Sequence, residues 1–162
     1  MRLTVLGEAT VSIGGHLVPR APTNFLRIVT YILLESNRHS VSRAKLAQIL
    51  WSETDQAHAS MNLRQSLARI RRFQEQFGIT LIESDAAYVR LNLASVSQGL
   101  LEIDLVEFFN CAEQGGPESA LKISELYHGD LLAQNEPDNS DFDEWLDIKR
   151  AKLRDDVILK IG

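Results

Sequence analysis

Residues 58–72 carry side chains that could hydrogen-bond and form ion pairs with an external polar ligand. The stretch contains no Asp or Glu, but it holds one His, one Asn, one Gln and four Arg. Guanidinium groups bind phosphates and bond bidentately to guanine, while Asn and Gln amides bond bidentately to adenine. Met61 and Ala68 add apolar groups that could contact a thymine methyl. This combination of side chains is typical of a surface that reads nucleic acid.

Helical spacing decides which of these side chains point outward. We expect a helix over residues 56–77, capped by Thr54 or Asp55 and closed by Gly78. At about 100° per residue from Leu63, the side chains within about 40° form the buried face: Ala59, Leu67, Ile70 and Phe77. The opposite face and its flanks carry the polar set: Met61, Gln65, Ala68 and Arg72, then His58, Asn62, Arg64 and Arg69.

Position along the helix separates base contacts from phosphate contacts. The N-terminal part of a recognition helix meets base edges, and the rest approaches phosphates. Base contacts are therefore assigned to His58, Met61, Asn62 and Gln65. Arg64 suits either role, Arg69 and Arg72 suit phosphates, and Arg71 near the helix edge is a weaker candidate. Further backbone contacts are expected from Arg43, Lys45 and Arg90.

A simpler explanation of the same pattern is that Arg, Asn and Gln cover a solvated helix. Arginines near a helix C-terminus also stabilise the helix dipole. The acid-free face favours nucleic acid, whereas the modest local charge does not.

The surrounding elements define the fold that would carry this helix. Short strands are expected over residues 2–6, 8–13 and 16–18, with a hairpin turn at Gly14-Gly15. A helix over residues 23–36 capped by Thr23, a short strand at 39–41 and a helix over 43–50 capped by Ser42 follow. Strands over 80–83 and 88–93 close a hairpin. The order predicts an α+β winged helix–turn–helix over residues 1–93, with a small antiparallel sheet, three helices and a wing hairpin.

Charge divides the chain into two unlike halves. Residues 1–93 hold 11 Lys and Arg against 7 Asp and Glu, whereas residues 94–162 hold 6 against 15. Helices are expected over 104–113, capped by Asp104, over 118–127 and over 141–161. The last should have an apolar stripe: Phe142, Trp145, Leu146, Ile148, Leu153, Val157 and Ile158. The second half is therefore predicted to be an all-α, TPR-like segment of helical hairpins.

A family resemblance joins the two halves. The strings VSRAKLAQILW (41–51), NLRQSLARIRR (62–72) and YVRLNL (88–93) resemble the OmpR/PhoB-type winged helix of Streptomyces antibiotic regulatory proteins. The strings YHGDLL (127–132) and DFDEWLDIKRAKLRD (141–155) resemble the start of the bacterial transcriptional activation domain that follows it there. The resemblance implies a transcriptional activator that binds direct-repeat operator DNA as a homodimer and recruits RNA polymerase. About 69 residues cover the activation domain, so the chain is either a piece of a longer regulator or has a reduced domain.

Other function classes find little support in the sequence. The four His have no i, i+4 partner, no Gly-rich loop opens a helix after a strand, and one cysteine, Cys111, excludes a Cys-based zinc site. The acids at 141–147 suit a helix N-terminus. We expect no enzyme activity, cofactor, metal or membrane contact, and a cytoplasmic location. The alternative function is a helical-repeat interaction module whose winged helix binds protein rather than double-stranded DNA.

Overall fold

The computed structural model describes the backbone of residues 1–161 and the side chains of residues 1–160. The chain divides into two compact units that are not continuous in sequence. The helix–hairpin unit comprises Arg20–Leu100 and Pro137–Asp143, and the strand–helix unit comprises Met1–Pro19, Leu101–Glu136 and the chain from Glu144 onward. These units do not coincide with a division at residue 93, because the N-terminal strands group with the C-terminal helices.

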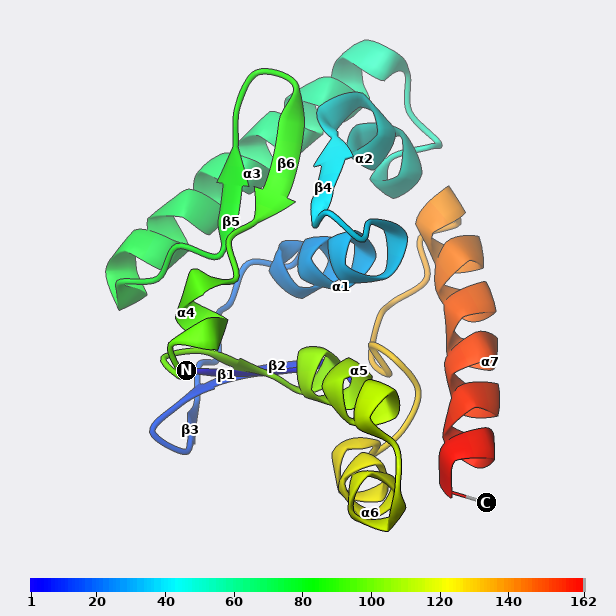
Figure 1. Cartoon of the computed structure of the whole chain (residues 1–162). Helices are drawn as coiled ribbons and strands as arrows, with labels where there is room; N and C mark the ends of the chain where they lie inside the picture. The colour runs from blue at the N-terminus through cyan, green and yellow to red at the C-terminus, as the bar shows by residue number, and fades with distance from the viewer. Residues whose placement is uncertain (162) are drawn as a thin grey trace. The chain divides into compact units, whose positions relative to one another are not determined.

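The helix–hairpin unit combines helices with a small antiparallel sheet (Figure 1). Its elements are α1 (Phe25–Glu35), β4 (Ser40–Ser42), α2 (Arg43–Leu50), α3 (Gln56–Phe77), β5 (Ile82–Ser84), β6 (Tyr88–Leu91) and α4 (Ala94–Ser97). The strand order is β4-β6-β5, with Val41 and Ser84 both paired with Val89 across the central strand. The expected bounds of α2 and α3 are confirmed, while both hairpin strands are shorter than expected.

The core of this unit comes from the apolar face of α1 packed against its neighbours. Phe25, Ile28, Val29 and Ile32 are buried, as their spacing predicts. The expected cap at Thr23 is wrong, because Asn24 occupies the N-cap position and makes no side-chain cap hydrogen bond. Asn24 instead donates from Nδ2 to Ser66 Oγ at 3.0 Å, which ties the start of α1 to α3.

The strand–helix unit is built on a second sheet whose fourth strand comes from far along the chain. Strands β1 (Arg2–Thr4), β2 (Thr10–Ile13) and β3 (His16–Leu17) form the expected antiparallel meander. β7 (Glu102–Ile103) was not expected, and it pairs in parallel with β1. This pairing explains why the first strands belong with the C-terminal helices in one compact unit.

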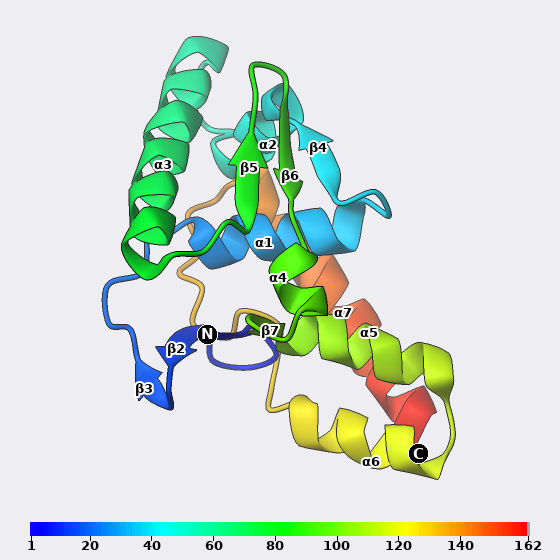
Figure 2. The same ribbon diagram turned by 60° about the vertical axis from the view of Figure 1, so that its left-hand side comes forward.

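Three helices complete the strand–helix unit. Helices α5 (Asp104–Gln114) and α6 (Pro117–Leu126) lie side by side and run in opposite directions (Figure 2). The turn between them uses Gly115 and Gly116, both at positive φ, where a side chain would be strained. Helix α7 (Asp141–Ile161) is anchored by Arg150, which donates to the carbonyls of Leu131 and Leu132 at 2.7 and 2.6 Å.

Two expectations for these helices are wrong. Asp104 does not cap α5 but lies in its first turn, buried, where its carboxylate accepts from the backbone N–H groups of Val5 and Leu6. The apolar stripe of α7 is also narrower than expected, because Ile148 and Ile158 are exposed whereas Leu153 and Val157 are buried. Charged residues on every side of this helix make its hydrophobic face hard to define from spacing alone.

Candidate nucleic-acid interface

The candidate site is the outer face of α3, and local signals at both ends define this helix. At its start, Asp55 Oδ1 accepts from the backbone N–H of His58 at 2.8 Å, so Asp55 rather than Thr54 is the cap. At its end, Gly78 adopts φ 65°, a left-handed conformation that glycine allows at little cost. The helix spans 22 residues, or about 33 Å at 1.5 Å per residue.

Packing on the inner face fixes the rotation of α3 about its axis. Ala59, Leu63, Leu67 and Ile70 are buried, as the helical periodicity predicts. Phe77 is only half-buried, and the larger aromatic contribution comes from Phe73, which was not predicted. The Phe73 ring lies 5.3 Å from that of Phe25 and 5.0 Å from that of Phe77. A helix held along this whole face cannot turn its opposite face inward.

The predicted outer face is accordingly open to solvent. Seven of the predicted residues are exposed: His58, Met61, Arg64, Gln65, Arg69, Arg71 and Arg72. Asn62 is half-buried at the edge of the face. Within residues 1–160, whose side chains are described, the four arginines of α3 make no ion pair or hydrogen bond through their guanidinium groups. Their charges are therefore available to an external anion.

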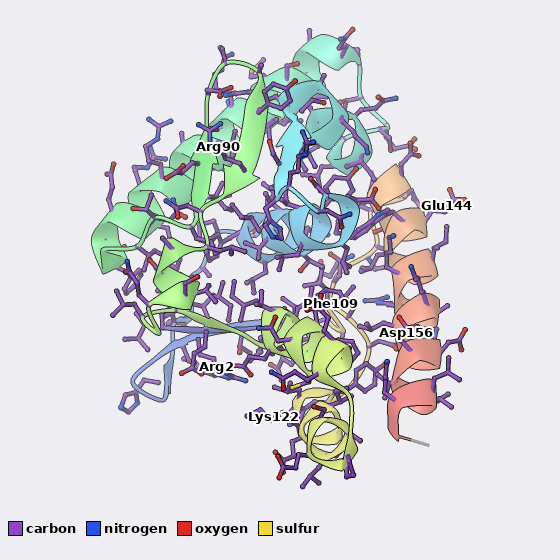
Figure 3. All side chains as sticks on the ribbon, viewed as in Figure 1. Arg2, Arg90, Phe109, Lys122, Glu144 and Asp156 are labelled. Carbon is purple, nitrogen blue, oxygen red and sulfur yellow. The ribbon has the colours of Figure 1, made fainter. Side chains whose placement is uncertain are left out.

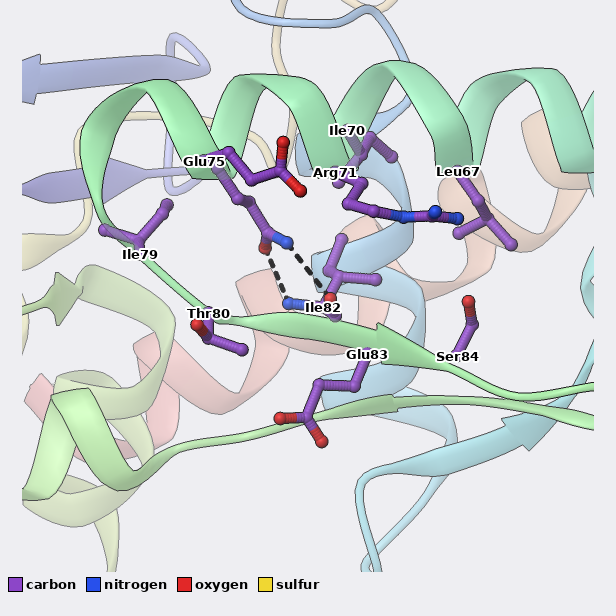
Figure 4. A pocket seen from close by; sticks show the side chains of 10 residues that line it. Leu67, Ile70, Arg71, Glu75, Ile79, Thr80, Ile82, Glu83 and Ser84 are labelled. Atoms are coloured by element: carbon purple, nitrogen blue, oxygen red, sulfur yellow. Dashed lines mark hydrogen bonds between the residues drawn. The ribbon is translucent and has the colours of Figure 1, made fainter.

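A buried amide that was not predicted from the sequence joins α3 to the hairpin. Gln74 is 4% exposed, and its Oε1 accepts from the backbone N–H groups of Leu81 and Ile82 at 3.1 and 2.7 Å. Its Nε2 donates to the carbonyl of Ile82 at 3.1 Å. Figure 4 marks the hydrogen bonds at Ile82 with dashed lines. The helical spacing could have revealed this contact. It places Gln74 about 20° from Leu63, on the buried face, where a polar side chain needs a hydrogen-bond partner.

A groove of about 320 Å³ runs between α3 and β5 beside this junction. Arg71 lies over the groove, together with Leu67 and Ser84, and its side chain runs along the helix (Figure 4). Arg71 thus lies beside the hairpin rather than at the centre of the outer face, in agreement with its predicted place at the helix edge.

The hairpin carries its own cation, which the protein neutralises internally. Arg90, labelled on β6 in Figure 3, lies 2.9 Å from Asp85 Oδ2 and 3.6 Å from Glu83 Oε2. The hydrogen bond from Arg90, with those from the Ala87 and Tyr88 backbone N–H groups, lowers the pKa of Asp85 to about 2. The same bond to Asp85 raises the pKa of Arg90. Arg90 is thus less available to an external anion than the arginines of α3.

The two predicted cations of α2 are also engaged. Arg43 donates from Nη1 to the carbonyl of Asp85 at 2.9 Å, which links the start of α2 to the hairpin turn. Lys45 Nζ lies 3.8 Å from Glu35 Oε2, and the Lys45 side chain is 58% exposed. The structure therefore brings the predicted site residues into one unit. Among their cations in the described part of the chain, only the four arginines of α3 make neither an ion pair nor a hydrogen bond through the guanidinium group.

Among the described residues, no three His, Cys, Asp or Glu side chains are grouped so as to hold a metal ion. No described helix combines the length and apolar character needed to cross a bilayer. Cys111 is a half-buried free thiol on α5.

Comparisons with known proteins bear on the fold. No protein-family model matches the chain, and no curated protein matches it. The structure is similar to that of EmbR from Mycobacterium tuberculosis, solved in complex with a low-affinity phosphopeptide, with a TM-score of 0.70 and 19% sequence identity. The match covers 98% of this chain and 43% of the EmbR chain. The two proteins therefore share a fold across both units.

Proposed function

We propose that this chain is a sequence-specific double-stranded-DNA-binding transcription regulator. The helix–hairpin unit would be a winged helix–turn–helix, in which α2 and α3 form the helix–turn–helix and β5–β6 is the wing. The observation that carries the proposal is the stretch of residues 58–72 on α3, which contains no acid and whose four arginines make no ion pair among the described residues. His58, Asn62 and Gln65 of the same stretch would contact bases. The shared fold with EmbR is compatible with this function but carries no residue-level evidence.

The residue roles follow from the position of each group on α3. His58, Met61, Asn62 and Gln65 would meet base edges in the major groove, where Asn and Gln prefer adenine. Arg69 and Arg72 would bind phosphates, Arg64 either a phosphate or guanine, and Arg71 the backbone on the hairpin side. Contacts from Arg43, Lys45 and Arg90 would be weaker, because each is already engaged.

The remaining assignments rest on the family resemblance and on the order of elements. Residues 1–93 would supply the DNA-binding domain and residues 94–162 the first part of a TPR-like activation domain. The antiparallel pair α5–α6 supports the second assignment, because such pairs are the units of helical repeats. An activator of this kind would bind direct repeats as a homodimer and contact RNA polymerase.

The test is selection of bound duplexes from a random DNA library, followed by affinity measurements at several salt concentrations. We expect an enriched motif, and a logarithmic salt dependence of about 0.9 per phosphate bound. Arg69→Ala should weaken binding about tenfold or more, as loss of a charge-assisted contact. Lys152→Ala removes the same charge from α7 and should change little. Absence of both an enriched motif and a salt dependence would contradict the proposal and favour a protein ligand.

A further inference from the structure

One carboxylate at the start of α3 has two separate tasks. Asp55 Oδ1 accepts from the backbone N–H of His58 at 2.8 Å, while its Oδ2 lies 2.7 Å from Nδ1 of the His58 ring. The first contact caps the helix, and a cap needs only that one oxygen. The second contact holds the imidazole of a residue that the proposed function places at a base edge.

The charge on Asp55 determines the tautomer of the His58 ring. Hydrogen bonds from the His58 backbone N–H and ring lower the pKa of Asp55, so the carboxylate is ionised near neutral pH. An ionised carboxylate only accepts hydrogen bonds. Nδ1 must therefore carry the proton, and in the neutral ring Nε2 is left as an acceptor.

The ring nitrogen that does not contact Asp55, Nε2 of His58, belongs to an exposed side chain on the outer face of α3. The side chains of His58 and Asp55 are 66% and 63% exposed. An exposed Nε2 acceptor matches the amino groups of adenine and cytosine in the major groove, whereas a protonated Nε2 would match the N7 and O6 acceptors of guanine. The carboxylate beside the ring would repel a phosphate, which favours a base edge over the DNA backbone as its ligand.

Most of the other charged groups around the start of α3 are engaged elsewhere. The elements packed against α3 carry Arg27 and Glu35 on α1, Arg43 and Lys45 on α2, and Glu83 on β5. Arg27 lies 3.6 Å from Asp138, Glu35 pairs with Lys45, Arg43 bonds to Asp85 and Glu83 pairs with Arg90. Glu53 lies exposed just before the helix. Among the described residues, the His58 side chain pairs with Asp55 alone.

We propose that Asp55 is a positioning residue that sets the base specificity of His58 by fixing its tautomer, so that Nε2 of the neutral ring accepts a hydrogen bond from a base amino group. This inference rests on the proposed function, but the tautomer of the His58 ring is a property of the free protein. Two substitutions separate the tasks of Asp55. Asp55→Ser keeps a capping oxygen and frees the ring. Asp55→Asn keeps the cap but turns an amide N–H toward Nδ1, which inverts the tautomer.

The first experiment measures the tautomer in the absence of DNA. Two-bond ¹H–¹⁵N correlation spectra of the His58 ring at about pH 8 distinguish the two nitrogens. We expect Nδ1–H in the wild type, Nε2–H in Asp55→Asn and a mixture in Asp55→Ser. A wild-type ring protonated on Nε2, or the same tautomer in all three proteins, would overturn the inference whatever the protein binds.

The second experiment measures base preference on duplexes selected from a random library at about pH 8. At one base-pair position we expect the wild type to prefer adenine or cytosine by about fivefold, the worth of one hydrogen bond. Asp55→Asn should shift that preference toward guanine, whose major-groove edge presents two acceptors and no amino donor. His58→Ala should lose the preference.

The outcomes separate the inference from the proposed function. Identical preferences at every position in the wild type, Asp55→Asn and Asp55→Ser would show that Asp55 is a helix cap only, while DNA binding stands. Failure of the wild type to bind any duplex would contradict the proposed function, and the tautomer measurement would still decide the role of Asp55.

Discussion

The arginines of α3 and those of the neighbouring α2–hairpin region differ in whether their guanidinium groups have partners within the protein. Arg64, Arg69, Arg71 and Arg72 make no ion pair among the described residues, while Arg90 is held by Asp85 and Glu83 and Arg43 by the Asp85 carbonyl. All of them belong to the same compact unit. Counting cations therefore overstates the charge that this unit offers to a polyanion, because half-exposed pairs neutralise part of it.

The difference arises from what lies within reach of each side chain. Residues 58–72 contain no acid, so Arg64, Arg69 and Arg72 have no acidic partner four residues away on α3. Arg71 has Glu75 four residues on, but the two make no ion pair. The hairpin instead places Glu83 opposite Arg90 in its register and brings Asp85 close through its turn. An anion that binds to α3 displaces only water, whereas binding to Arg90 must compete with two carboxylates.

The largest effect should come from removing two free arginines rather than two engaged ones. The double substitution Arg69→Ala and Arg72→Ala should weaken binding to a selected duplex by about 100-fold or more, and lower the salt slope by about 1.8. The double substitution Arg43→Ala and Arg90→Ala removes the same charge and should have a much smaller effect on both. Fluorescence anisotropy over a salt series measures both the affinity and the salt slope. Equal losses in the two double variants would show that the arginines of α3 bind DNA no better than those of α2 and the hairpin.

A second prediction concerns the junction between the two regions. Gln74→Ala leaves the backbone N–H groups of Leu81 and Ile82 without their acceptor, and should lower the free energy of unfolding by about 2–3 kcal/mol. Gln65→Ala removes an exposed amide from the same helix and should change the stability by under about 0.5 kcal/mol.

Urea denaturation compares the two glutamine variants directly. Similar losses in both would show that the amide of Gln74 is dispensable for joining α3 to β5.

Local signals explain how much of the fold is readable from sequence. The bounds of α2 and α3 follow from Ser42 and Asp55, which bond to the N–H groups three residues on, and from Gly78 at the C-terminus. The rotation of α3 follows from its apolar spacing, which predicts most of the exposed set, although Asn62 and Ala68 are half-buried. Each of these features depends on residues within one or two helical turns of each other.

Features that depend on distant partners were not predictable in this way. The β1–β7 pairing joins Leu3 to Ile103 through a strand of two residues, which is too short for periodicity to reveal. Asp104 resembles a helix cap in sequence, and only that pairing brings Val5 close enough to donate to it. The roles of the α3 side chains stay predictions, because exposure shows that they are available but not what they bind.

A third prediction concerns a substitution that should release Arg90 of the hairpin from its nearest carboxylate. Asp85→Asn retains an oxygen that can accept from the Ala87 and Tyr88 N–H groups, so the turn is kept, but it removes the charge facing Arg90. The salt slope of DNA binding should rise by up to about 0.9, with tighter binding at low salt. Glu83→Gln, which removes the longer contact of 3.6 Å, should have a smaller effect in the same direction. Unchanged slopes in both variants would place Arg90 outside the DNA interface.

The smallest effect concerns pH, and it separates Asp85 from the residues that titrate near neutrality. Because the pKa of Asp85 is about 2 in the folded hairpin against an ordinary 3.8, its ionisation stabilises the hairpin above about pH 4. That contribution should be lost as the pH falls from about 4 to about 2, and amide exchange of β5–β6 should accelerate there in the wild type but less in Asp85→Asn. Both groups are exposed, so salt should weaken the effect. Since Asp85 stays ionised between pH 5.5 and 8, any change in DNA binding over that range must come from another group. A wild-type-like loss of protection in Asp85→Asn would show that its pairing with Arg90 does not hold the hairpin.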